Sequence, residues 1–179
     1  MLPVVLIDVD GPLNPYAAKA TKRPEGYLTH RLKPKGFEYG KGLRVWLNPL
    51  HGPSLMALEA DLVWATMWEA DANKLIGPEI GLPELPFIDF GATKTGIYAT
   101  ENMNSIKTYF KTPRIAYKMV KHFGGVPFLW IDDECTQVDE DFLKEACGVE
   151  VKAYYVDPKI GLTDKDFENI AEWIKENSK

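Results

Sequence analysis

Short apolar runs alternate with amphipathic stretches along the chain. Each run is continuous, is bounded by turn residues, and has the length of a strand covered on both faces. The runs predict strands over 3–9, 61–66, 127–131 and 149–155, with a further short strand over 87–90. The stretches between them predict helices over 53–60, 69–76, 112–123, 139–146 and 163–177. This alternation predicts a doubly wound, Rossmann-like α/β fold whose mainly parallel sheet carries helices on both faces.

The segment 12–50 interrupts this alternation directly after the first strand. It is rich in glycine, proline and lysine, and two short extended pieces, 26–32 and 43–47, predict a hairpin. We interpret 12–50 as a small flap, too short for a separate cap domain. With 179 residues, the whole chain, 1–179, fits a single domain.

Composition narrows the class of protein. Hydrophobic residues make up 45% and charged residues 26%, which is typical of a globular protein. No apolar run approaches the roughly 20 residues of a membrane span, so we expect no membrane association. The chain begins in a strand without a basic leader, and Cys135 and Cys147 form no Cys-x-x-Cys pair. We therefore expect reduced thiols and a cytoplasmic protein.

The net charge of −5 is unevenly distributed. Segment 12–50 holds eight basic and two acidic residues, a charge of +6, which leaves −11 on the rest of the chain. A basic flap beside acidic motifs favours an anionic substrate. A solvated lysine-rich loop explains the same charges equally well.

Acidic and hydroxyl residues lie at the ends of three of the predicted strands. They are Asp8 and Asp10, Thr66, and Asp132 with Asp133. Parallel strands place their carboxyl ends along one edge of a sheet, so we expect these side chains to converge. Several carboxylates in one crevice require a cation, and oxygen ligands suit Mg²⁺. Each motif alone has a simpler interpretation, as a turn, a strand end or a helix N-terminus.

Together the motifs resemble the haloacid dehalogenase superfamily. Asp8-Val9-Asp10-Gly11 is similar to its first motif, Asp-x-Asp-Gly after a buried strand, and Thr66 is similar to its second. Lys111 is our choice for the lysine of the third motif, over Lys107 and Lys118. Asp132-Asp133 is similar to the acidic pair of the fourth. The motifs occur in the family's order and span residues 8–133.

The resemblance implies a Mg²⁺-dependent phosphatase. Asp8 would attack phosphorus and form an aspartyl-phosphate, and Asp10 would protonate the leaving oxygen and then activate water. Thr66 would hydrogen-bond a phosphoryl oxygen, and Lys111 would offset negative charge. The implied metal ligands are Asp8, the backbone carbonyl of Asp10, Asp133 directly, and Asp132 as a ligand or as a support for one.

Four further residues are predicted to contact substrate. Trp68 and Asn73 follow Thr66, where a loop would face the crevice, and Arg23 and Arg44 belong to the basic flap. The expected partner is a small phosphate monoester, with nucleotides favoured by the basic flap. A pI of about 5.3 argues against strong binding to duplex nucleic acid. The sequence leaves the oligomeric state open.

Two other functions fit the same residues. A receiver-like signalling module also uses Mg²⁺, an aspartate, a hydroxyl and a lysine, but its acidic pair lies on the first strand and its acceptor on a later one. A catalytically silent binding protein of the same fold is the second alternative, against which the intact acidic positions argue.

Overall fold

The centre of the molecule is a four-stranded parallel sheet. In the computed structural model, which describes residues 1–91 and 108–178, the strand order is β4-β1-β5-β6. The strands are β1 (Val4–Ile7), β4 (Asp61–Trp64), β5 (Phe128–Asp132) and β6 (Val151–Tyr155). All three pairings are parallel, and β1 lies between β4 and β5. The predicted α/β class and parallel sheet are confirmed.

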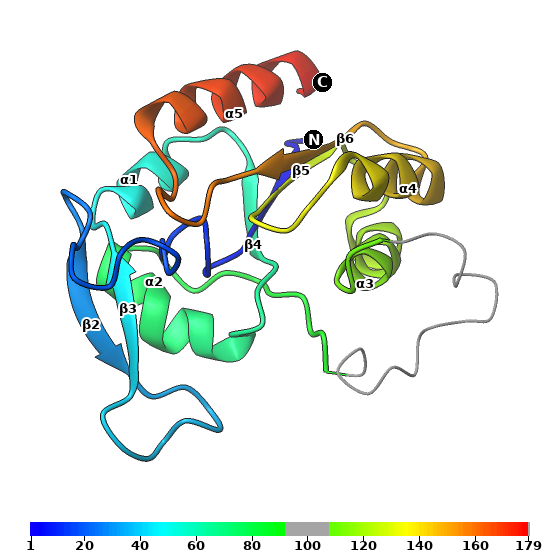
Figure 1. The fold of residues 1–179 in the computed structure, drawn as a ribbon. Coiled ribbons are helices and arrows are strands. Elements are labelled where there is room, and N and C mark those ends of the chain that lie inside the picture. Colours follow the sequence, from blue (N-terminus) through cyan, green and yellow to red (C-terminus); the bar gives the residue numbers. More distant parts are fainter. Residues whose placement is uncertain (92–107, 179) are drawn as a thin grey trace.

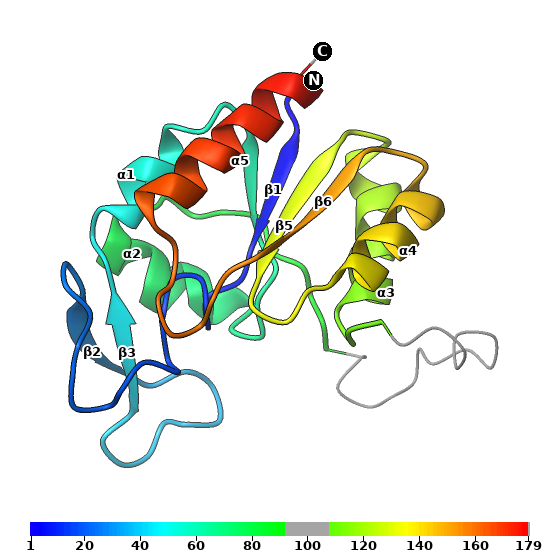
Figure 2. The ribbon, with the colours of Figure 1, turned by 45° about the horizontal axis from the view of Figure 1, so that its top comes forward.

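Alternate residues of each strand enter two different apolar clusters. Val5 and Ile7 of β1 pack in one cluster with α1 (His51–Met56) and α5 (Asp164–Asn177). Val4 and Leu6 pack in the other, with α3 (Thr112–Lys118), its π-helical continuation η4 (Met119–Phe123), and α4 (Gln137–Cys147). Figures 1 and 2 show α1 and α5 on one side of the sheet, and α3 and α4 on the other. Within the described residues, no helix is long and apolar enough to cross a membrane.

The predicted hairpin in segment 12–50 is confirmed. Strands β2 (Leu28–Leu32) and β3 (Leu43–Leu47) pair antiparallel, with Leu28 opposite Leu47. Leu32, Val45 and Leu47 are buried in the same cluster as α5, which fixes the hairpin to the body of the protein. Figure 2 shows the hairpin near the end of the sheet at which β1 stops.

Three predicted elements differ in the structure, and the first is the helix after β4. The helix predicted over 69–76 does not end there, because η1 (Ala72–Ile76) continues into α2 (Gly77–Ile80). Pro78 lies directly after this junction, in the first turn of α2, and Gly81 ends the helix with a φ of 78°.

The strand predicted over 87–90 is wrong. Phe87 forms only an isolated bridge to Trp64, and the backbone N–H of Phe90 donates to the Glu69 carboxylate instead of to a strand. The helix predicted over 53–60 is displaced, since α1 ends at Met56.

Candidate functional site

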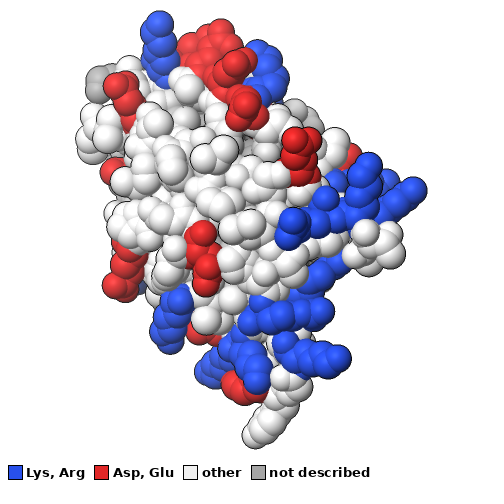
Figure 3. Space-filling model, turned by 90° about the vertical axis from the view of Figure 1, so that its left-hand side faces the viewer, with Lys and Arg blue, Asp and Glu red and all other residues white. Residues whose placement is uncertain are grey.

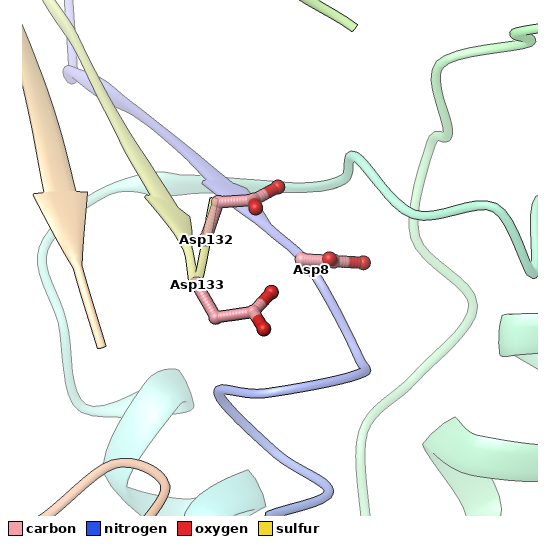
Figure 4. Close-up of side chains that lie close together, drawn as sticks. All are labelled: Asp8, Asp132 and Asp133. Atoms are coloured by element: carbon pink, nitrogen blue, oxygen red, sulfur yellow. The ribbon is translucent and has the colours of Figure 1, made fainter. Parts of the chain in front are cut away.

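Three carboxylates meet where β1 and β5 end. Ile7 pairs with Ile131, and the Asp8 N–H donates to the Ile131 carbonyl at 3.0 Å, so the next residues emerge side by side. Figure 4 shows the carboxylates of Asp8, Asp132 and Asp133 projecting in the same direction from these ends. One oxygen of each lies within 4.8 Å of the others. The expected convergence at one sheet edge is confirmed for these residues.

Lys111 lies between two of these carboxylates. Its Nζ donates to Asp8 Oδ2 at 2.7 Å and to Asp132 Oδ2 at 2.8 Å, and the lysine is 1% exposed. A charged amine is buried this deeply only when it is paired. Burial by itself would lower the pKa of Lys111, but the charges of Asp8 and Asp132 outweigh it and raise the pKa. The lysine is therefore a fixed cation.

The ionised forms of the three carboxyl groups are disfavoured even with Lys111 beside them. Burial raises the pKa of Asp8, although Lys111 opposes the effect. Burial, followed by the charge of Asp8, raises the pKa of Asp132 to about 7. Burial also raises the pKa of Asp133, against a hydrogen bond from Tyr16. The cluster holds three carboxylates and one ammonium, so it has a charge of −2 when fully ionised.

Gly11 allows this geometry. Its φ is 92°, and a Cβ atom at this position would lie 2.5 Å from Cβ and Cγ of Asp133. Only glycine avoids both the unfavourable φ and the collision. The glycine of the first motif therefore makes room for the acidic pair of the fourth.

The Asp10 carboxylate is held at both oxygens. Asn14 Nδ2 donates to Oδ1 at 2.8 Å, and Trp68 Nε1 donates to Oδ2 at 2.9 Å. Asn14 Oδ1 also accepts the backbone N–H of Trp46 in β3, at 3.0 Å. The hairpin is thus connected to Asp10 through one buried amide.

Thr66 lies next to Asp8 through the neighbouring strand. The Ala65 N–H donates to the Ile7 carbonyl at 2.8 Å, which sets the end of β4 beside the end of β1. The Thr66 hydroxyl and Lys111 both oppose the effect of burial, which on balance raises the pKa of Asp8. The hydroxyl oxygen also accepts the N–H of Trp68 at 3.3 Å.

A pocket of about 440 Å³ opens over these residues. It is lined by Asp8, Asp10, Lys111 and Asp133 from the predicted motifs, and by Trp68 and Arg44 from the predicted substrate contacts. The sequence analysis did not single out the remaining seven lining residues: Asn14, Tyr16, Leu43, Val45, Met67, Tyr109 and Glu134.

Two tyrosines border the acidic pair. Tyr16 donates to Asp133 Oδ2 at 2.9 Å, and the Tyr109 hydroxyl donates to Glu134. Tyr16 could have been found from the sequence, because it comes soon after the first motif. Tyr109 could also have been found, because it lies only two residues before Lys111.

Asp139 holds the segment that carries Lys111. Its Oδ1 accepts the Tyr109 N–H and the Thr112 hydroxyl, each at 2.6 Å, and its Oδ2 accepts both N–H and hydroxyl of Thr136. Asp139 also occupies the N3 position of the capping box that starts α4. The Thr136-x-x-Asp139 pattern could have revealed the cap, but not the contact with α3.

The other predicted site residues differ in placement. Asn73 does not line the pocket, since its amide bonds Trp64 Nε1 and the backbone of Leu85. Arg23 is exposed and lines no part of the pocket either. Arg44 does line it, with its guanidinium 3.8 Å from the centroid of the Trp46 ring. Lys118 lies within α3, and Lys107 lies outside the described residues.

Comparison with known proteins identifies no relative. No protein-family model matches the chain, and no curated protein and no solved structure matches it. The geometry of the residues is therefore the basis for any functional conclusion.

Proposed function

We propose that the protein is a Mg²⁺-dependent phosphatase of the haloacid dehalogenase type, with Asp8 as nucleophile. The observation that carries the proposal is the buried Lys111, paired with Asp8 and Asp132 beside Asp133 at the floor of an open pocket. Buried polar clusters of this kind cost folding free energy, and such groups concentrate at functional sites.

The donor set fits a hard divalent cation. Asp8, Asp132 and Asp133 offer one oxygen each within 4.8 Å, and the charge of −2 that remains beside Lys111 equals the charge that Mg²⁺ would neutralise. These three side chains would hold the ion, with the backbone carbonyl of Asp10 as a further ligand. When bound, the ion supplies positive charge that lets an anionic phosphate approach the carboxylates.

The reaction would proceed in two displacements. An Asp8 oxygen forms a bond to phosphorus while the bond from phosphorus to the ester oxygen breaks, and Asp10 gives its proton to that oxygen. Asp10 then takes a proton from water, whose oxygen displaces Asp8 from phosphorus and releases inorganic phosphate. Lys111 and Thr66 stabilise negative charge in both transition states.

The proposed function also includes a doubly wound arrangement of helices and a flap over the pocket. The helices on both faces would form the doubly wound arrangement of such hydrolases, and the hairpin would act as a flap over the pocket. The assignment of the chain to one domain and to the cytoplasm stays a prediction, as does the preference for nucleotides.

The replacement Asp8→Asn tests the proposal. Sustained release of phosphate from a generic ester with Mg²⁺ is expected for the wild type. The variant should lose about a thousandfold or more of kcat, because an amide cannot act as the nucleophile. Asp61→Asn is the matched control, since Asp61 is exposed at the opposite end of β4. Full activity in Asp8→Asn contradicts the mechanism, and a single phosphorylation without turnover indicates a receiver.

A further inference from the structure

The catalytic pocket continues into a larger groove. This groove, of about 780 Å³, runs between the hairpin loop at 34–37 and the segment 67–74 that follows β4. Asp10, Leu43, Met67 and Trp68 line both cavities, so the two are contiguous. A ligand in the first pocket that is longer than a phosphate group can therefore extend into the second.

The position of Asp10 fixes which part of a substrate enters this groove. In the proposed reaction Asp10 protonates the oxygen of the leaving group, so that oxygen must lie near its carboxylate. Asp10 stands on the border between the two cavities and is anchored there by Asn14 and Trp68. The leaving group then lies beyond Asp10, in the groove, while the phosphate remains at Asp8.

The lining of the groove combines apolar side chains with a few ionisable ones. Half of its twelve residues have apolar side chains: Pro34, Phe37, Leu43, Met67, Trp68 and Ala70. Its ionisable residues are Asp10, Lys35, Glu69, Asp71 and Lys74, with a formal charge of −1. Asp71 accepts the Lys35 backbone N–H at 2.7 Å and lies 3.7 Å from Lys74 Nζ. This lining does not favour further negative charge on the leaving group.

The basic residues of the flap do not alter this conclusion. Of the eight lysines and arginines in 12–50, only Lys35 and Arg44 line either cavity. Figure 3 shows Lys and Arg side chains gathered over the lower half of the hairpin side of the molecule. The charge asymmetry of the sequence is therefore mostly a property of the outer surface and not of the groove.

We propose, building on the phosphatase function, that the groove binds the leaving group of the substrate and selects esters whose leaving group is a flat apolar or aromatic ring system. Phe37 is the main selecting residue. It is 55% exposed, and its N–H donates to the Pro34 carbonyl in a turn that Gly36 completes with a φ of 90°. Burying such a ring against Phe37 and Met67 supplies the hydrophobic free energy of selection.

Binding of two non-hydrolysable phosphonates tests this proposal apart from catalysis. We would measure dissociation constants of 2-naphthylmethylphosphonate and methylphosphonate calorimetrically with Mg²⁺. The wild type should bind the naphthyl compound at least about tenfold more tightly, and this ratio should fall to about twofold or less in Phe37→Ala. Tyr39→Ala is the matched control, because Tyr39 is an aromatic on the same loop, is 92% exposed, and lines neither cavity. It should keep the wild-type ratio.

The possible outcomes separate the two proposals. Equal affinities in the wild type, or an unchanged preference in Phe37→Ala, would overturn the groove assignment even if esters are hydrolysed. A preference lost equally in Tyr39→Ala would also overturn it, because the effect would then belong to the loop as a whole. Retained hydrolysis in Asp8→Asn would instead overturn the phosphatase mechanism, whatever the phosphonates show.

Discussion

At the scale of single residues, the site consists of charged groups whose burial is unfavourable for each one alone and is compensated when they are paired. Asp132 is fully buried and Asp8 nearly so, and each depends on the ammonium of Lys111 for a compensating charge. Asp133, in turn, takes its place only because Gly11 has no side chain.

Replacement of Gly11 by alanine tests this dependence. The new methyl group would collide with Asp133, so we expect a loss of about 2–3 kcal/mol in the free energy of unfolding and a large loss of the proposed phosphatase activity. Gly81→Ala is the control, since Gly81 has a φ of 78° but nothing within 4 Å of its Cβ position. It should cost about 1 kcal/mol and leave activity intact. Urea unfolding and phosphate release would measure both, and equal effects of the two changes would refute the collision.

The sequence predicted the charged residues of the site better than their surroundings. Asp8 and the pair Asp132-Asp133 were found because they stand at the ends of apolar runs, which predict strands. Asn73 was placed in the site by proximity to Thr66, yet its amide satisfies Trp64 and Leu85. Hydrogen bonds between distant segments, like that of Tyr16 with Asp133, leave no local pattern in a sequence.

At the scale of elements, strands were more predictable than the pieces that connect them. A continuous apolar run can be buried on both faces only in a central strand, which is why β1 and β5 were clear. The 87–90 segment has a similar apolar character, but whether it joins a sheet depends on partners for its backbone, and Glu69 takes one of them. Connections between helices are likewise fixed by side chains such as His51, which links α1 to the turn before α5.

His51 makes the packing of α1 sensitive to pH. The His51 side chain is buried, its Nε2–H donates to the Leu162 carbonyl, and burial lowers its pKa to about 4 from 6.5. The folded state therefore takes up this proton less readily than the unfolded state. The contribution of neutral His51 to the free energy of unfolding is therefore complete above pH 6.5. It is lost as the pH falls toward 4, and the total loss is about 3 kcal/mol.

Urea unfolding at several pH values between 7 and 4 would measure this loss. His51→Gln should flatten the dependence on pH relative to the wild type, whatever its stability at pH 7. His122→Gln, at an exposed histidine, should leave the dependence unchanged. An identical pH profile in wild type and His51→Gln would exclude His51 as the cause.

At the scale of the whole molecule, the sheet order brings both halves of the chain to one site. The central β1 pairs with β4 on one side and β5 on the other. Side chains as far apart in the sequence as Asp8 and Asp133 therefore meet at the same end of the sheet. Alternation of strands and helices predicted the α/β class, and the hairpin was predicted by its turn-rich segment. The groove between hairpin and body was not predicted, because it is a space between segments and not a property of either.

Magnesium should stabilise the whole fold if the acidic cluster binds it. At a hundredfold excess over its dissociation constant, a ligand of the native state adds about 2.7 kcal/mol, which raises Tm by about 5–10 °C for a protein of this size. Thermal unfolding with MgCl₂, against NaCl of equal ionic strength, measures the shift, and chelation should reverse it. Asp133→Asn should greatly reduce the shift and Asp61→Asn should keep it; a shift of equal size in Asp133→Asn would rule out this cluster.

The placement of β1 at the centre of the sheet also has a consequence for how the chain folds during synthesis. Val4 pairs with Asp61 and with Phe128, so β1 is synthesised before both of its partners, which follow 57 and 124 residues later. Until Lys111 and β5 have emerged, the nascent chain contains Asp8 without its compensating charge and an apolar strand with open edges. Such segments are prone to aggregation, so the early chain is where a chaperone would have the most effect.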